Sequence, residues 1–285
     1  MKKKRVLKPV CTYQGGKQRY AKEIVNQLLE SETITDQTIF YDGYCGSGAI
    51  ALELVNRGIS PERIVMIDQS MWGLFWKQIG EGSFNLERFK RVLNEVPTDK
   101  QFIQTYVSEL AKNPQEELLV EHFLILQACS FGGKPIDFKE GKWQHSGFRN
   151  YWQPTETSIR KSPVNPMQPT VDELYQRVEL LVKEMKGVKG IYQDIRKINF
   201  ECGAKDVFYL DPHYQQTTGY HHEFEVMEFV NRHQTQVELY VSESFVLSPH
   251  YIELNLGGAK GGITAKKKQR TVEVLNIFKK KKDID

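Results

Sequence analysis

Apolar residues recur at helical and strand spacing along most of the chain and predict an alternation of helices and strands. Residues 20–31, YAKEIVNQLLES, place four apolar side chains on one helical face. The next run, TIFYDG, is apolar and β-prone. It leads into the glycine-rich turn YCGSGA and then into a helix that ends near Gly58.

The run RIVMIDQS repeats the strand pattern and ends in Asp68. Strand, glycine loop, helix, strand and acid follow one another in the order that opens a doubly wound α/β nucleotide-binding fold. We therefore expect a Rossmann-like core of this class, with residues 1–80 as its cofactor-binding half.

The middle of the chain, residues 81–168, breaks this alternation. Helical stretches such as FKRVLNEV and EELLVEHFLILQACS precede a run of Gly, Pro, aromatic, Lys and Arg residues that has no clear period. These features predict a mainly helical and loop insert.

Residues 169–285 return to the α/β pattern. VDELYQRVELLVKEMKG and FEVMEFVNRH have helical spacing, whereas KGIYQDI, DVFYLDP and VELYVSES have the character of strands. YIELNL and TVEVLNIF flank a connection rich in glycine and lysine, so they predict a terminal antiparallel pair. We expect this part to form the second, catalytic half of the core.

The composition is that of an ordered globular protein, with 40% hydrophobic and 26% charged residues. No apolar run approaches the roughly 20 residues of a membrane span, and no signal sequence follows the N-terminal lysines. We therefore expect a cytoplasmic protein without a membrane partner. The four cysteines form no CxxC pair and have no histidine at zinc spacing, so we expect free thiols and no metal.

Positive charge gathers in short clusters although the formal net charge is only +3. The clusters lie at residues 2–5, 260–270 and 279–282. They suit a polyanionic partner, with solvated tails as the alternative.

Three glycines in YDGYCGSGAIA, Gly43, Gly46 and Gly48, allow a tight turn and close approach of the backbone to a ligand. Asp68 lies 20 residues beyond Gly48, at a distance where a carboxylate can accept ribose hydroxyls. A helix-capping role is the alternative for Asp68. The pattern favours an adenosine-containing ligand but does not by itself separate a dinucleotide from S-adenosylmethionine.

The tetrapeptide DPHY, residues 211–214, offers groups that suit methyl transfer to an exocyclic amine. The lone pair of such an amine is delocalised into the ring, so transfer needs acceptors that hold its two hydrogens. Asp211 can offer a carboxylate oxygen, and Pro212 can offer a backbone carbonyl in a fixed direction. Tyr214 can stack on a flipped base, whereas the third position has no required side-chain chemistry. A plain strand-to-turn Asp-Pro pair is the alternative.

Cysteine placement argues against methylation of cytosine at ring carbon 5. That reaction needs a thiolate nucleophile, usually in a Pro-Cys pair, and no cysteine of this chain follows a proline. An amino group remains as the methyl acceptor.

These segments together resemble the D12 class, or Dam-like, DNA adenine methyltransferases, particularly the versions carried by phages. The resemblance runs in order through YQGGKQRYAKEI, FYDGYCGSGAIALEL, IVMIDQS, SFGGK with GFRNYW, VFYLDPHYQQTTGYHHEF, VELYVSES and TVEVLNIF. It implies a methyltransferase that transfers the methyl group of S-adenosylmethionine to the N6 amine of a flipped adenine in duplex DNA. A monomer in the cytoplasm of a bacterial or phage-infected cell is expected, and residues 81–168 would recognise the target.

The resemblance also implies roles for individual residues. Asp211, Pro212 and Tyr214 would be catalytic. The cofactor would be bound by Tyr13, Lys17, Asp42, Gly43, Gly46, Gly48, Asp68, Asp194, Ile195 and Asp211. Among these, Lys17 would lie near the cofactor carboxylate, Asp68 at the ribose, and Asp194 with Ile195 at the adenine. A strand-end cap is the alternative for Asp194, and a packing role is the alternative for Tyr13.

DNA would be contacted by cationic and planar side chains, which hold phosphates and fill the gap left by a flipped base. The candidates are Lys134, Lys142, Trp143, Arg149, Tyr151 and Trp152 in the insert, with Lys260 and Lys266 in the glycine and lysine-rich loop. Some of these aromatic residues are instead expected to pack the insert.

The chain departs from the family pattern at two positions. Asp42-Gly43-Tyr44 stands where the family usually has Glu-Pro-Phe, and His213 replaces the second proline of Asp-Pro-Pro-Tyr. The first change brings loop placement and cofactor affinity into question, and we expect His213 to be an exposed loop residue. Two alternatives therefore remain: a relative that binds DNA or cofactor without methyl transfer, and a methyltransferase acting on RNA or on a protein glutamine.

Overall fold

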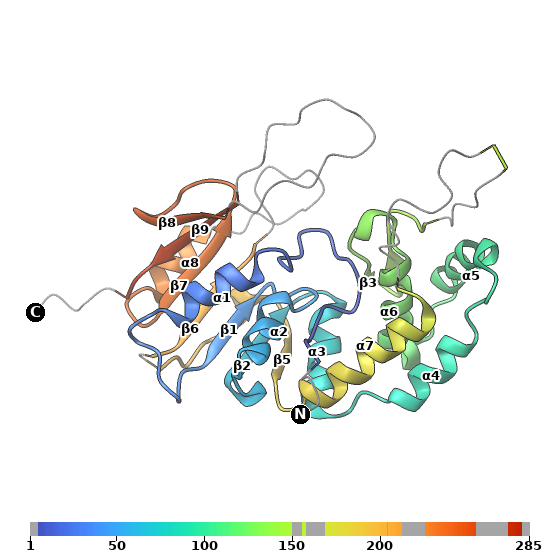
Figure 1. The fold of residues 1–285 in the computed structure, drawn as a ribbon, viewed down its shortest axis with the longest axis horizontal. Coiled ribbons are helices and arrows are strands. Elements are labelled where there is room, and N and C mark those ends of the chain that lie inside the picture. The colour runs from blue at the N-terminus through green and yellow to red at the C-terminus, as the bar shows by residue number, and fades with distance from the viewer. Residues whose placement is uncertain are drawn as a thin grey trace, which may run out of the picture.

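The computed structural model describes residues 5–149, 156–157, 169–203, 205–212, 226–254 and 273–280. A seven-stranded sheet lies at the centre of this part of the chain (Figure 1). In spatial order its strands are β5 (Lys189–Tyr192), β2 (Ile64–Asp68), β1 (Phe40–Gly43), β6 (Val207–Leu210), β7 (Glu238–Glu243), β9 (Glu273–Phe278) and β8 (His250–Leu254).

The first five strands in this order are parallel, and β9 runs antiparallel to both of its neighbours, β7 and β8. The parallel part has the strand order of a doubly wound nucleotide-binding fold. The predicted α/β class and the predicted terminal antiparallel pair are therefore confirmed.

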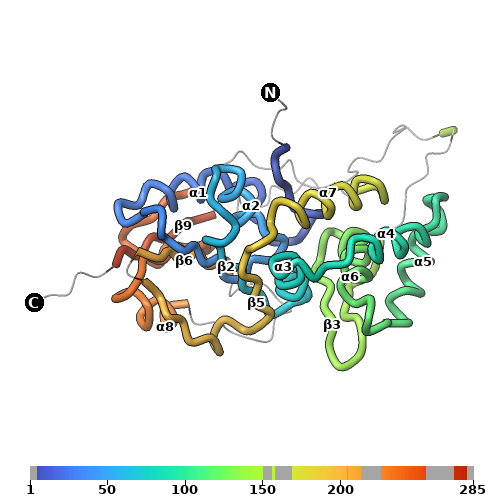
Figure 2. The backbone as a smooth tube through the Cα atoms, turned by 90° about the horizontal axis from the view of Figure 1, so that it is seen from below, coloured from blue at the N-terminus to red at the C-terminus, as the bar shows by residue number. Residues whose placement is uncertain are grey.

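Alternation along the strands separates two hydrophobic layers, because successive side chains of a strand point to opposite faces. In β2, Ile64 and Met66 join the larger cluster, whereas Val65 and Ile67 join the smaller one. Helices α1 (Ala21–Leu29), α2 (Ala49–Asn56) and α3 (Met71–Glu81) supply the larger cluster. Helix α8 (Val226–His233) supplies the smaller one, so the sheet lies between two helical layers (Figure 2).

Helix α3 approaches β5 closely enough that only glycine fits at the contact. A Cβ atom on Gly80 would lie 1.8 Å from the carbonyl oxygen of Val188, and one on Gly190 would lie 2.2 Å from the backbone nitrogen of Lys77. This approach holds α3 against the edge of the sheet, and the beginning of α3 lies directly after the end of β2.

The insert contains three helices, α4 (Leu86–Asn94), α5 (Lys100–Lys112) and α6 (Leu119–Cys129). Where the sequence predicts only long loops, the structure has a short hairpin of β3 (Asp137–Lys139) and β4 (Lys142–Gln144). The described residues also form single turns of 3₁₀ helix, η1 (Pro61–Arg63), η2 (Glu116–Leu118), η3 (Phe131–Gly133) and η4 (Ile195–Lys197).

The insert and the sheet share one hydrophobic core. The rings of Trp72 in α3 and Phe123 in α6 meet edge to face, with centroids 4.9 Å apart, and Phe84 lies between Phe75 and Phe89. Helix α7 (Val171–Glu184) begins with a capping box formed by Thr170 and Glu173 and packs against both α3 and α4. Helices α4 and α6 of the insert and helix α3 of the sheet layer therefore belong to one continuous packing unit.

Candidate active site

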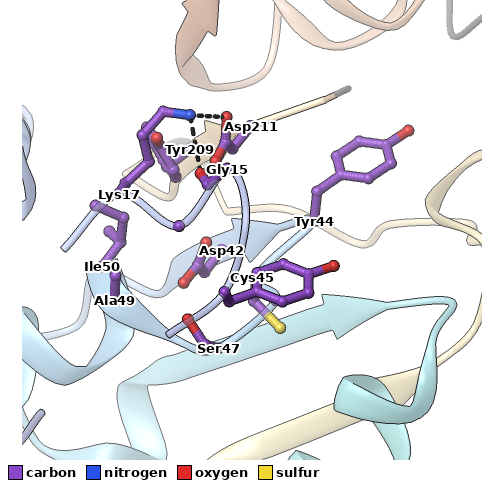
Figure 3. A pocket seen from close by; sticks show the side chains of 13 residues that line it. Gly15, Lys17, Asp42, Tyr44, Cys45, Ser47, Ala49, Ile50, Tyr209 and Asp211 are labelled. Atoms are coloured by element: carbon purple, nitrogen blue, oxygen red, sulfur yellow. Dashed lines mark hydrogen bonds and ion pairs between the residues drawn. The ribbon is translucent and has the colours of Figure 1, made fainter. Parts of the chain in front are cut away.

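A hollow opens at the carboxyl ends of β1 and β6 (Figure 3). In the sheet, β2 and β5 lie on one side of β1, and β6 lies on its other side. This is the topological switch point, where open α/β sheets bind their ligands. Five predicted site residues line the hollow, namely Tyr13, Lys17, Asp42, Gly46 and Asp211.

The loop between β1 and α2 is held in its turn by contacts from α3 and β2. Three of its residues have positive φ angles, Tyr44 (61°), Gly46 (47°) and Gly48 (79°). The indole nitrogen of Trp76 donates to the carbonyl oxygen of Gly46 at 2.8 Å, and the backbone nitrogen of Gly46 donates to Asp68 at 2.8 Å. The loop therefore has a fixed shape that exposes its backbone to the hollow.

Position 43 leaves no room for a side chain, so glycine is required there. A Cβ atom at this position would lie 2.6 Å from Cδ2 of Leu210 and 2.8 Å from Cδ1 of Ile195, both buried. The space beside Gly43 is taken by these two side chains. The loop is thus anchored by Trp76 and Asp68 without a rigid residue at position 43.

Asp42 is a buried carboxylate at the end of β1. Its Oδ2 accepts the backbone N–H of Ala51 in the first turn of α2 at 3.2 Å. Burial raises the pKa of Asp42 to about 8, and the nearby carboxylates of Asp211 and Asp68 add to this effect. A positively charged ligand in the hollow would stabilise the ionised form of Asp42.

Lys17 reaches across the hollow to Asp211 at the end of β6 (Figure 3). Its Nζ lies 2.6 Å from Oδ1 of Asp211, 3.3 Å from the carbonyl oxygen of Gly15 and 3.6 Å from Oε1 of Glu273. Burial lowers the pKa of Lys17, but Asp211 and Glu273 outweigh that effect, so the pKa is raised and Lys17 is cationic. Burial also raises the pKa of Asp211, which Lys17 opposes.

Two acids near this pair were not predicted from the sequence. Glu243 is the last residue of β7, and its Oε2 accepts the backbone N–H of Ser244 at 2.7 Å. Burial raises the pKa of Glu243. Glu273 is the first residue of β9. The position of Glu243 at the end of a predicted strand was an available signal, whereas that of Glu273 depends on how the terminal hairpin joins the sheet.

Asp68, Asp194 and Ile195 stand beside the hollow and not in its lining. Asp68 accepts hydrogen bonds from Gly46 and from the backbone and hydroxyl of Ser70, the residue that caps α3. Asp194 caps η4 and accepts from Nε of Arg196 at 2.9 Å. The capping alternative is therefore present for Asp194, whereas Asp68 hydrogen-bonds to the capping residue of α3 and is not itself the cap.

Tyr13 both packs and lines the hollow. Its ring meets that of Trp72 edge to face with centroids 5.7 Å apart, and a Cβ atom on Gly46 would lie 2.9 Å from Cε1 of Tyr13. Pro212 is buried directly after Asp211. The predictions for His213 and Tyr214 fall outside the described residues.

The predicted DNA contacts in the insert divide into surface and interior positions. Lys134 and Lys142 are exposed, and Arg149 donates to the carbonyl oxygen of Ser130 at 2.9 Å. Trp143 is buried and its ring packs 5.0 Å from that of Phe138, so the structure places it in the core of the insert and not on its surface. Tyr151, Trp152, Lys260 and Lys266 lie outside the described residues.

Neither a metal site nor a membrane-spanning helix is found among the described residues. No group of three or more His, Cys, Asp or Glu side chains in this part of the chain could hold a metal ion. Within the same residues, every helix is too short or too polar to cross a membrane. In comparisons with known proteins, no protein-family model and no curated protein matches the chain.

Proposed function

We propose that this chain is a DNA adenine methyltransferase of the D12 class, which uses S-adenosylmethionine to methylate the exocyclic N6 amine of adenine in duplex DNA. The observation that carries the proposal is the charge of the hollow at the switch point. Its acidic and basic lining side chains are Asp42, Asp211 and Lys17. Lys17 is already paired with Asp211, so the carboxyl of Asp42, whose pKa is raised to about 8, would ionise most readily beside a cationic ligand.

This charge pattern favours a cationic ligand over a dinucleotide. A pyrophosphate group would bring negative charge close to the carboxylate of Asp211 and would further oppose ionisation of Asp42 in a poorly solvated site, where like charges repel strongly. S-adenosylmethionine carries a positively charged sulfur and an ammonium group, which the carboxylates of Asp42 and Asp211 would attract. Lys17 is the described cation of the lining that could meet its carboxylate.

The glycine loop would let the same ligand approach its backbone closely. The positive φ angles of Gly46 and Gly48 turn the backbone where a side chain would collide with Tyr13 or Trp76. An ionised carboxylate has about four acceptor positions. Asp68 uses three of them in the described contacts, which leaves one acceptor position for a ribose hydroxyl.

S-adenosylmethionine would supply a methyl group whose bond to sulfur breaks with the electron pair remaining on sulfur. Asp211 would accept one hydrogen of the target amine, and the carbonyl of Pro212 would accept the other. These acceptors direct the nitrogen lone pair away from the ring, so that it can form the new bond to carbon. The proton lost from the amine would pass to the carboxylate of Asp211 and then to water.

The argument for a polyanionic substrate comes from the exposed side chains of the insert. Lys134 and Lys142 expose their ammonium groups there, and such groups bind phosphates without reading sequence. A protein glutamine would offer no regular row of phosphates. RNA shares the phosphates, so the assay below includes it.

The test is a product analysis. The purified protein is incubated with methyl-labelled S-adenosylmethionine and either duplex DNA of random sequence, RNA or a glutamine-containing protein mixture. We expect label in N6-methyldeoxyadenosine after digestion of the DNA. Asp211→Ala should abolish this label, whereas Asp172→Ala, at an exposed position of α7, should retain it.

Three results would contradict the proposal. Label in RNA alone or in protein alone would show that the substrate is RNA or protein and not DNA. No label above the Asp211→Ala background in any substrate would favour a relative that binds without methyl transfer.

A further inference from the structure

We propose that Glu273, at the start of the C-terminal strand β9, is a positioning residue of the active site that acts on Asp211 through Lys17. The proposal rests on the proposed function for its catalytic meaning, but the contacts that carry it are independent of any ligand. Lys17, Asp211 and Glu273 come from the N-terminal loop, the end of β6 and the start of β9.

The three side chains form a shielded charge cluster. Their exposed fractions are 6% for Lys17, 16% for Asp211 and 11% for Glu273. Ion pairs this far from solvent are less screened than surface pairs, so removing one partner changes the charge balance of the others.

One cation serves several acids at this place. The described charged groups that interact with Asp211 are Lys17 and the carboxylates of Glu243 and Asp42, and Glu273 reaches Asp211 through Lys17. The hydroxyl of the buried Tyr209 also interacts with Asp211 and is bonded to Ser242. Lys17 therefore interacts with both Asp211 and Glu273.

The distances from Lys17 to the two acids show which of them it contacts more closely. Lys17 holds Oδ1 of Asp211 at 2.6 Å and lies 3.6 Å from Glu273, so its closer contact is with the catalytic carboxylate. No hydrogen bond from a described residue reaches Oδ2 of Asp211. One oxygen of Asp211 is thus anchored, and the other can accept a hydrogen from the target amine.

Glu273 would set how strongly Lys17 stabilises the ionised carboxylate of Asp211. With Glu273 neutral, Lys17 would pair with Asp211 alone, and the carboxylate would be a weaker proton acceptor. With Lys17 neutral, the buried Asp211 would face Glu243 and Asp42 without a counterion, and its protonated form would be favoured. The two changes therefore shift the titration of Asp211 in opposite directions.

The experiment follows the carboxyl carbon of Asp211 by nuclear magnetic resonance in the ligand-free full chain labelled with ¹³C-aspartate. The signal is assigned with Asp211→Asn. We expect the titration midpoint to move to lower pH in Glu273→Gln and to higher pH in Lys17→Met. Glu273→Asp, which keeps the charge, should restore the midpoint toward that of the unmodified chain.

Glu253→Gln is the matched control, because Glu253 is an exposed acid on the neighbouring strand β8. It should leave the midpoint unchanged. A second readout is the pH profile of methyl transfer, whose acidic limb should move to lower pH in Glu273→Gln with little change in KM for S-adenosylmethionine.

The outcomes separate this inference from the proposed function. If the unmodified chain transfers no methyl group but the midpoint of Asp211 moves as expected, the charge cluster stands and the proposed function fails. If Glu273→Gln leaves the midpoint in place, raises it, or moves it no more than Glu253→Gln does, the inference is wrong whatever the activity.

Discussion

At the scale of single residues, Gly43 shows how closely the loop after β1 is packed by distant parts of the chain. The absence of a rigid proline suggested a loosely placed loop, but Leu210 and Ile195 fill the space above Gly43. Their positions depend on β6 and η4, which lie more than 150 residues away in the chain. Such a contact cannot be predicted from the local pattern of residues 40–48.

Adding one methyl group at position 43 should therefore destabilise the fold. We expect Gly43→Ala to lower the free energy of unfolding by about 1–3 kcal/mol, because the new Cβ overpacks a well-filled core. Gly203→Ala is the control, since its Cβ would meet Asp206 only at an ordinary 3.5 Å. Denaturant unfolding measures both variants. Equal stability of the two would show that Leu210 and Ile195 move aside.

Lys17, Asp42, Gly46 and Asp211 lie in the lining of the hollow, whereas Gly48, Asp68 and Asp194 do not, and the roles predicted for all of them stay predictions. Glu243 and Glu273 were missed because their approach to Lys17 depends on β7 and β9 being neighbours in the sheet.

At the scale of elements, α3 was not predicted although it anchors the glycine loop. Its sequence, MWGLFWKQIGE, contains two glycines that resemble helix breakers and aromatic residues without a clear polar face. The glycines have a tertiary reason. A Cβ atom on Gly73 would lie 2.1 Å from the carbonyl oxygen of Asp68, and Gly80 meets Val188 in the same way.

Two tryptophans of α3 provide a matched test of the loop anchor. Nε1 of Trp76 donates to Gly46, whereas Nε1 of Trp72 is buried without a partner among the described residues. We expect Trp76→Phe to cost about 1–3 kcal/mol more than Trp72→Phe, because it leaves the carbonyl oxygen of Gly46 unsatisfied. Only Trp76→Phe should also weaken binding of S-adenosylmethionine.

Chemical denaturation and calorimetric titration measure these two effects. The loop-anchor account would be contradicted by equal stability of the two variants together with unchanged ligand affinity in Trp76→Phe.

At the scale of the whole molecule, the insert is part of the core fold and not an appended domain. Trp72 and Phe123 join α3 to α6, and α7 packs on both α3 and α4. The break in alternation predicts an insert at residues 81–168, and this division of the chain stays a prediction. The shared core could not be predicted, because it depends on aromatic contacts between residues about 50 positions apart.

A buried ion pair inside the insert tests this continuity. Arg88 of α4 donates to Glu121 of α6 at 2.7 Å, and the Glu121 side chain is 1% exposed. Arg88→Met would leave that carboxylate buried without its cation. We expect a cost of about 3 kcal/mol, toward the lower end for buried pairs because Arg88 is partly exposed.

The loss should appear in a single unfolding transition shared by the insert and the sheet, followed by circular dichroism and tryptophan fluorescence. Arg91→Met, at an exposed position of the same helix, should change stability by less than about 0.5 kcal/mol. An early transition confined to one probe would mean that the insert unfolds as a separate domain.

The central claim is that the acidic hollow at the switch point binds S-adenosylmethionine. Calorimetric titration with S-adenosylmethionine and with NAD⁺, at pH 7 and pH 9, tests it most directly. Because the pKa of Asp42 is raised to about 8, its carboxyl is mainly neutral at the lower pH and mainly ionised at the higher one. In Asp42→Asn the side chain is neutral at both pH values. A change in affinity between pH 7 and pH 9 in this variant therefore reports the titration of the ligand's own amino group.

We predict that S-adenosylmethionine binds and NAD⁺ does not. We also predict that affinity for S-adenosylmethionine rises from pH 7 to pH 9 in the unmodified chain relative to Asp42→Asn. Tighter binding of NAD⁺, or no binding of S-adenosylmethionine at either pH, would contradict the account.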